Sequence, residues 1–165
     1  MKNGFEIERK FLIKFPPISL LLKIENVRVM NIEQSYLEGG GRIRKISENG
    51  KTSYIKTVKK HITDIKREEK EWEITEEEYK NDLCGIAYGT NTIVKTRYAV
   101  PLNGFIYEVD IFPFWKDRAF MEVELKSEGE TFKIPDFIEI IKEVTFDKRY
   151  NNSSLARKVV NEDII

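Results

Sequence analysis

Charged residues occupy every second position along several segments of this chain that have the composition of β-strands. The clearest case is the segment 4–13, in which Glu6, Glu8 and Lys10 alternate with mostly apolar residues. Because successive side chains of a strand point to opposite faces, the two carboxylates and the ammonium group share one face. The pattern recurs downstream, in Arg42/Arg44, Arg67/Glu69/Glu71/Glu73, Lys95/Arg97, Glu108/Asp110 and Glu122/Glu124. The chain must therefore fold so that many strands place an ionic face somewhere other than in a dry core.

The segment pattern predicts a mainly β protein of the α+β class with a few peripheral helices. Strands are predicted over 4–13, 29–38, 42–47, 51–58, 66–74, 92–100, 104–112, 119–127 and 142–147. Asn49-Gly50 between two of these strands is a strong hairpin signal. Short helices are expected within 18–28, over 75–84, where Thr75 to Glu78 forms a capping box, and over 152–161. Antiparallel strands in this number and in so short a chain predict an eight-stranded β-barrel.

The apolar positions between the charged ones indicate which way the charges face in such a barrel. If the apolar faces pack against helices, the charged faces converge on one another and line a polar tunnel. Burying these charges is prohibitive unless they pair, bind ions or stay hydrated. A charged, multivalent ligand meets that condition. The alternative is that each charged face simply meets water and forms cross-strand ion pairs.

Length and composition limit the remaining possibilities. The chain has 165 residues, which fits one domain over 1–165. Lys and Arg total 28, as do Asp and Glu, so net charge gives no reason to expect a nucleic-acid partner. Cys84 is the single cysteine, no signal peptide is visible, and no apolar run approaches transmembrane length. These features predict a cytoplasmic protein without a membrane partner, and they leave a homodimer open.

The charged residues on these faces suit two kinds of ligand. The i,i+2 carboxylate pairs Glu6/Glu8 and Glu122/Glu124 have no Cys or His nearby, and oxygen-only ligands favour Mg²⁺ or Mn²⁺ over zinc. Arginine forks and lysine point charges match phosphate oxygens. The residues concerned are Arg42, Arg44, Lys56, Lys95 and Arg97, for which cross-strand pairing with Glu69, Glu71 and Glu73 is the competing interpretation.

A set of short motifs follows one order along almost the whole chain. It consists of Glu6-Ile7-Glu8-Arg9-Lys10-Phe11-Leu12, Glu33-Gln34-Ser35-Tyr36-Leu37, Arg42-Ile43-Arg44, Lys56-Thr57, Lys95-Thr96-Arg97-Tyr98, Tyr107-Glu108-Val109-Asp110, Glu122-Val123-Glu124 and 143–150. In combination the motifs resemble those of the CYTH superfamily, the triphosphate tunnel metalloenzymes, and most of all its short bacterial tripolyphosphatases. One departure is Ser35, where the family pattern has glycine.

The resemblance implies a tunnel of eight antiparallel strands that hydrolyses inorganic tripolyphosphate to pyrophosphate and phosphate with Mg²⁺ or Mn²⁺, as two ions. It implies catalytic roles for Tyr36 and Lys95 as a pair and for Glu6 and Glu8 at the attacking water. The triphosphate-binding residues would be Lys10, Arg42, Arg44, Lys56, Arg67, Arg97 and Lys148, and the metal ligands would be Glu6, Glu8, Glu69, Asp110, Glu122 and Glu124.

Other activities on the same fold stay open from the sequence. They are those of class IV adenylate cyclases, thiamine triphosphatases and nucleoside triphosphatases. A non-catalytic binder of polyphosphate or nucleotide is a different class of alternative. It would need the basic residues but not the carboxylates, and this chain has both.

Overall fold

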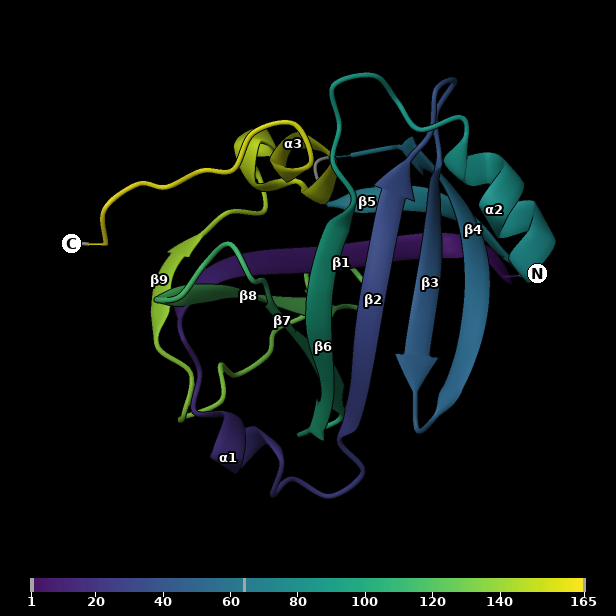
Figure 1. Ribbon diagram of the computed structural model, residues 1–165. Coiled ribbons are helices and arrows are strands. Elements are labelled where there is room, and N and C mark those ends of the chain that lie inside the picture. Colours follow the sequence, from purple (N-terminus) through teal and green to yellow (C-terminus); the bar gives the residue numbers. More distant parts are fainter. Residues whose placement is uncertain (1, 64, 165) are drawn as a thin grey trace.

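A computed structural model describes residues 2–63 and 65–164 and shows an antiparallel sheet that closes on itself (Figure 1). Its strands are β1 (Lys2–Lys14), β2 (Arg28–Tyr36), β3 (Arg42–Glu48), β4 (Lys51–His61), β5 (Lys66–Ile74), β6 (Ile93–Leu102), β7 (Phe105–Ile111), β8 (Arg118–Glu124) and β9 (Ile140–Glu143). Three short α-helices and a 3₁₀ turn accompany them: α1 (Ile18–Leu21), α2 (Glu76–Leu83), α3 (Asn152–Leu155) and η1 (Lys148–Tyr150).

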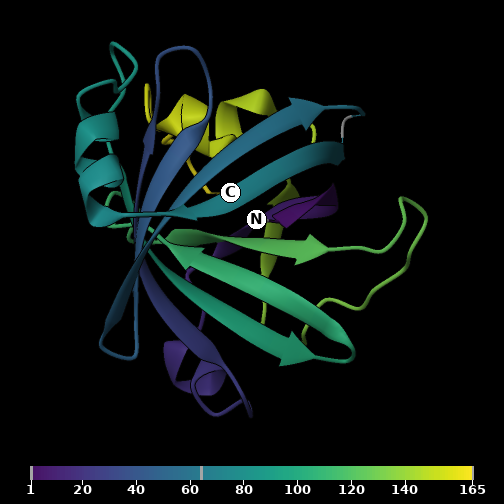
Figure 2. The same ribbon diagram turned by 90° about the vertical axis from the view of Figure 1, so that its right-hand side faces the viewer.

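Closure of the barrel depends on β1. The sheet order is β5-β4-β3-β2-β6-β7-β8-β1-β9, and β1 also pairs with β5. Residues 2–7 of β1 pair with β5, residues 8–14 pair with β8 along the other edge, and β9 pairs with Phe11 to Ile13. In Figures 1 and 2, β6, β2, β3 and β4 lie side by side while β1 crosses behind them. The predicted eight-stranded antiparallel barrel is confirmed, with β9 added.

The Asn49-Gly50 turn fixes the register of the β3–β4 hairpin. Glu48 pairs with Lys51 across a two-residue loop in which Asn49 and Gly50 have φ of 49° and 75°, as a type I′ turn requires. Counting back along the hairpin pairs Arg42 with Thr57. Directly opposed residues share a face of the sheet, so Thr57 lies on the same face as Arg42, and residue 56 on the other.

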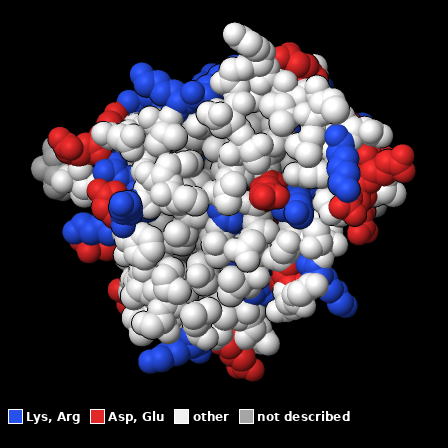
Figure 3. All heavy atoms as spheres, viewed as in Figure 1, with Lys and Arg blue, Asp and Glu red and all other residues white. Residues whose placement is uncertain are grey.

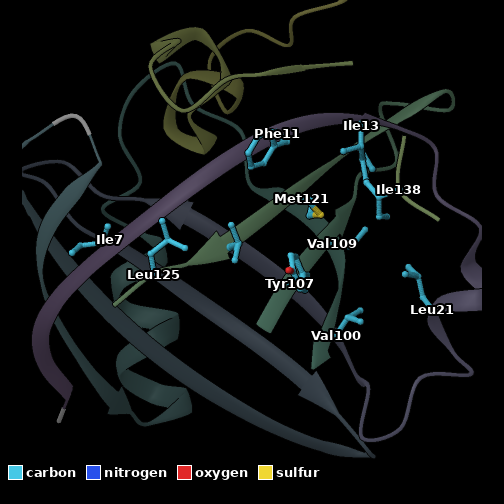
Figure 4. Close-up of a cluster of buried hydrophobic side chains, with 12 residues drawn as sticks. Ile7, Phe11, Ile13, Leu21, Val100, Tyr107, Val109, Met121, Leu125 and Ile138 are labelled. Atoms are coloured by element: carbon cyan, nitrogen blue, oxygen red, sulfur yellow. The ribbon is translucent and has the colours of Figure 1, made fainter. Parts of the chain in front are cut away.

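The outer faces of β1, β7 and β8 carry one hydrophobic cluster (Figure 4). It uses the residues that alternate with the charged ones, among them Ile7, Phe11, Val109 and Met121, all of which are buried. Leu21 of α1 and Ile138 of the segment before β9 pack on the same cluster. The apolar positions therefore face outward under peripheral segments, as the alternation predicts, and the alternate positions face the barrel interior.

A second, aromatic cluster packs around η1 and α3. Trp115 meets Phe120 edge to face with ring centroids 5.0 Å apart, and Tyr150 and Leu155 pack on them. The predicted helix over 152–161 is wrong beyond Leu155, and the predicted strand over 142–147 lies earlier, as β9. Beyond Leu155 the chain continues without helix, and Trp115 Nε1 donates a hydrogen bond to the carbonyl of Val160 at 2.9 Å. This contact places the segment after α3 against the aromatic cluster.

Helix α2 begins where the sequence predicts. Thr75 Oγ1 accepts a hydrogen bond from the amide of Glu78 at 3.1 Å, and Glu78 Oε2 accepts one from the amide of Thr75 at 2.7 Å. This reciprocal pair is the predicted capping box.

Figure 3 shows mostly uncharged atoms across the centre of the face formed by β2 and β6, with charged side chains mainly at its edge. Within 2–63 and 65–164, no helix is long and apolar enough to cross a membrane.

Candidate active site

The interior faces of the strands enclose a cavity of about 340 Å³. Its walls come from β1, β4, β5, β6, β7, β8, the end of β2 and the start of β3, with the segment that leads into α3 on one side. The structure brings together here eight of the residues proposed from the sequence: Glu6, Glu8, Lys10, Tyr36, Arg42, Arg67, Arg97 and Glu122.

Three carboxylates of the cavity each contact a cation. The pairs are Glu6 with Lys59, Glu8 with Arg67 at 3.0 Å, and Glu122 with Lys10 at 3.3 Å. The carboxylates also repel one another. Burial, followed by the charges of Glu122 and Glu6, raises the pKa of Glu8 to about 7.

Nearby cations stabilise the charged form of Glu122. Burial alone would raise its pKa, but the cations Lys10 and Arg97 outweigh burial and hold that pKa far below the usual range. Its buried Oε1 atom lies 3.3 Å from Lys10 Nζ, but no contact of this atom with the described residues has hydrogen-bond geometry. A charged, buried carboxylate whose oxygen lacks a well-formed hydrogen bond is suited to bind a cation that enters the cavity.

Arg42 and Arg44 place two positive charges close together at the cavity. Among the described residues, Arg42 is in no ion pair, and its buried Nε makes no hydrogen bond. Arg44 lies behind it and pairs with Glu71 at 2.5 Å. Burial and then the nearby charge of Arg42 lower the pKa of Arg44 to about 10. Burial would lower the pKa of Arg42, but nearby Tyr36 and Glu6 outweigh burial and raise that pKa. The half-buried guanidinium therefore stays charged with a donor that has no partner among the described residues, which suits an anion.

Asp110 forms ion pairs with two cations, Lys95 and Arg97. It is fully buried and accepts hydrogen bonds from Lys95 Nζ at 2.7 Å and from Arg97 Nε and Nη2 at 2.7 and 2.8 Å. Arg97 also contacts Glu108 at 2.6 Å. Burial, then the charge of Arg97, lowers the pKa of Lys95 to about 8. Asp110 therefore faces two cations, and within the described chain no hydrogen bond joins Lys95 to Tyr36.

Several residues proposed from the sequence lie outside the cavity. Lys56 is on the outer face of β4, where it pairs with Asp82 of α2 at 2.8 Å. Lys148 in η1 and Glu124 at the end of β8 are exposed, although Glu124 stands opposite Glu8 in the register. The remaining four, Glu69, Asp110, Arg44 and Lys95, are buried behind the lining residues, in contact with other charges.

The cavity also contains residues to which the sequence analysis assigned no role. Lys59 and His61 extend the face of Thr57 on β4, and Glu108, which the sequence places on one face with Asp110, lies on the inner face of β7. The hairpin register could have identified Lys59, because it lies two positions beyond Thr57. Thr145 and 151–153 contribute neutral amides and hydroxyls from a segment without strand periodicity, so no pattern pointed to them.

The donors present fit a hard divalent cation in their chemistry. Glu6, Glu8 and Glu122 offer carboxylate oxygens, none of the described lining residues is a cysteine, and Glu122 Oε1 accepts no hydrogen bond from the described residues. In 2–63 and 65–164, no group of three or more His, Cys, Asp or Glu is gathered closely enough to form a complete site by itself. Protein carboxylates in incomplete sets are typical of Mg²⁺ sites that take further oxygens from water and phosphate.

Comparison with known proteins agrees with this geometry. The family model described as the CYTH domain matches residues 4–157. The solved structure of the inorganic triphosphatase NE1496 is similar, with 28% identity, a TM-score of 0.60, and coverage of 94% of this chain and 97% of that one. The PH1819 protein from Pyrococcus horikoshii OT3 shares the fold, at 22% identity and a TM-score of 0.58 over 74% and 80% of the two chains. No curated protein matches.

Proposed function

This chain belongs to the CYTH domain family, and from that premise we propose that it hydrolyses inorganic tripolyphosphate to pyrophosphate and phosphate with Mg²⁺ or Mn²⁺. The observation that carries the proposal is Arg42, a half-buried guanidinium that forms no ion pair within the described part of the chain and lies near Arg44 and Arg97. A linear polyphosphate supplies several negative charges in a narrow shape. The similarity to an inorganic triphosphatase over nearly the full length supports the same substrate class.

The residues divide into two sets by charge. Arg42, Arg97 and Lys10 would bind phosphate oxygens, because a guanidinium fork and an ammonium match those acceptors. Glu6, Glu8 and Glu122 would hold the divalent ions. Such ions, when bound, neutralise phosphate charge and lower the pKa of water. The carboxylates keep those ions in place and exclude competing anions.

Catalysis by this chain would rest on positioning and electrostatics. Phosphoryl transfer needs little covalent assistance, since the developing charge spreads over oxygens that cations and donors can stabilise. Arg97 is held by Asp110 and Glu108, so its guanidinium is oriented before substrate binds. Tyr36 lines the cavity and can donate a hydrogen bond to a phosphate oxygen.

Purified protein is expected to release phosphate from tripolyphosphate in the presence of Mg²⁺ or Mn²⁺, and to stop when EDTA removes the metal. ATP and thiamine triphosphate should turn over more slowly, and ATP should give no cyclic AMP. Phosphate release and cyclic AMP are measured side by side for each substrate and each metal. Faster turnover of ATP or thiamine triphosphate would assign the protein to one of the alternative activities, and binding without turnover would make it a non-catalytic binder.

Lys59 and Lys56 form a matched pair of substitutions on one strand. Lys59 lines the cavity, and Lys59→Met removes one cation there, so KM for tripolyphosphate should rise about tenfold, the lower end of what one charge-assisted hydrogen bond contributes. Lys56→Met breaks a partly exposed pair with Asp82 on the outside, which contributes about 0–1 kcal/mol to stability. It should keep the wild-type kcat/KM. Equal losses in the two variants, measured by steady-state kinetics, would contradict this placement.

A further inference from the structure

Gln34 is a fully buried polar side chain on the inner face of β2. Its Nε2 donates a hydrogen bond to the hydroxyl of Tyr36 at 3.0 Å, and Tyr36 is two positions further along the same face. Tyr36 lines the cavity, whereas Gln34 lies behind it. The other amide atom, Oε1, is buried and has no hydrogen-bond partner among the described residues. A buried amide with one unsatisfied acceptor costs free energy of folding, and a functional role for Gln34 would account for that cost.

The contact with Gln34 determines how the Tyr36 hydroxyl is oriented. A phenol has one hydrogen to donate and an oxygen that accepts. The amide of Gln34 occupies the accepting side from within the protein. Arg42 also lies near this hydroxyl, and its charge partly offsets the rise that burial causes in the pKa of Tyr36. Two donors on the protein side leave the hydroxyl hydrogen to point into the cavity, where the proposed substrate has only acceptor oxygens.

We infer that Gln34 is a positioning residue, which holds the Tyr36 hydroxyl as a hydrogen-bond donor aimed at a phosphate oxygen of the substrate. The inference rests on the proposed function. A donor that is already oriented pays no reorganisation cost as charge develops on that oxygen, so its benefit appears mainly in the transition state. Loss of Gln34 should therefore lower kcat more than it changes KM.

The test is a double-mutant cycle on tripolyphosphate hydrolysis. Gln34→Met keeps the length of the side chain but removes the amide, and Tyr36→Phe removes the hydroxyl. Gln34→Met alone is expected to lower kcat about tenfold, which corresponds to one hydrogen bond of about 1.4 kcal/mol, and to change KM little. In the Tyr36→Phe background it should cause no further loss, because residues that act through one another are not additive.

Ser35→Ala is the matched control. Ser35 is the next residue of β2, is also fully buried, and its hydroxyl is 2.8 Å from Thr92 Oγ1 on the opposite face of the strand. This variant loses a buried hydrogen bond of the same strand, and its kcat should stay near that of the wild type. Circular dichroism and thermal unfolding report whether each variant is folded. Gln34→Glu serves as a second variant, and it should show the same loss of kcat because its carboxyl oxygens accept the hydroxyl hydrogen and turn it away from the cavity.

The outcomes distinguish failure of the positioning role of Gln34 from failure of the proposed function. Losses in the two single variants that simply add in the double variant would overturn the positioning role, as would a Gln34→Met effect confined to KM or equal to that of Ser35→Ala. A wild-type protein that releases no phosphate from tripolyphosphate would instead overturn the proposed function, and this inference with it. Non-additivity with the kcat effect would support the inference.

Discussion

Replacing Arg42 by methionine is expected to remove most triphosphate hydrolysis while lowering the stability of the folded protein only modestly. The guanidinium forms no ion pair among the described residues and lies next to Arg44, whose pKa its charge helps to lower. Two charge-assisted hydrogen bonds to phosphate contribute about 1.5–3 kcal/mol each, so kcat/KM should fall by about 100-fold or more. Burial would lower the pKa of Arg42, but nearby Tyr36 and Glu6 outweigh burial and raise it, so removing its charge should lower the free energy of unfolding, by about 1 kcal/mol.

A large loss of activity with a small loss of stability distinguishes a binding residue from a structural one. Steady-state kinetics gives the activity, and urea unfolding without substrate gives the stability. Arg28→Met is a suitable control, because Arg28 pairs with Glu48 at 2.7 Å on the exposed surface and lies outside the cavity. It should leave turnover unchanged and alter stability by about 1 kcal/mol or less. An Arg42→Met protein that loses far more stability than Arg28→Met, or that keeps wild-type activity, would show that Arg42 has a structural role only.

Glu122→Gln is expected to have the second large effect, and here activity and stability should fall together. The substitution keeps shape but removes the negative charge that Lys10 approaches at 3.3 Å and Arg97 at 4.0 Å. Leaving buried cations without their counter-charge costs about 3–5 kcal/mol. The loss of a proposed metal ligand should weaken Mn²⁺ binding and lower kcat by about 100-fold or more, the scale of removing one preorganised electrostatic group.

Titration with Mn²⁺, followed by electron paramagnetic resonance, measures the metal affinity independently of turnover. Glu143→Gln is the control, since this carboxylate pairs with Arg9 at 2.6 Å on β9 and does not line the cavity. If Glu122→Gln fails to fold, Glu8→Gln tests the same part of the cavity, because the charge of Glu122 acts on Glu8, whose carboxylate contacts Arg67 at 3.0 Å. Unchanged Mn²⁺ affinity in the folded variants would exclude these carboxylates as metal ligands.

The alternation of charged and apolar residues was enough to predict the strands and which face of each points inward. Period-two alternation is a local signal, and Ile7 and Phe11 pack outside while Glu6 and Glu8 line the cavity, as expected. The Asn49-Gly50 turn predicts the face of Lys56 better than the motif match does. A two-residue Asn-Gly turn fixes every pair in the hairpin, so it already places Lys56 opposite in face to Thr57, outside the barrel.

The rest depended on contacts that no local pattern encodes. The segment after Leu155, predicted as helix, lies where Trp115 and Arg118, more than forty positions away in the sequence, donate hydrogen bonds to the carbonyls of Val160 and Glu162. Which cation neutralises which carboxylate is likewise set by the closed register. The strand faces alone could not tell that Asp110 is paired with Lys95 and Arg97 while Arg42 forms no ion pair with any described residue.

The pairing of β1 determines when, during synthesis of the chain, the proposed site can form. One strand carries Glu6, Glu8 and Lys10 and also joins partners near residues 66–71, 118–124 and 140–143. Contacts of such long sequence separation form late and slowly in folding. The inner faces that carry Glu6 and Glu122 therefore cannot meet before β8 has been synthesised. Until then β1 lacks its partner along that edge, and the proposed polyanion site is incomplete in a growing chain.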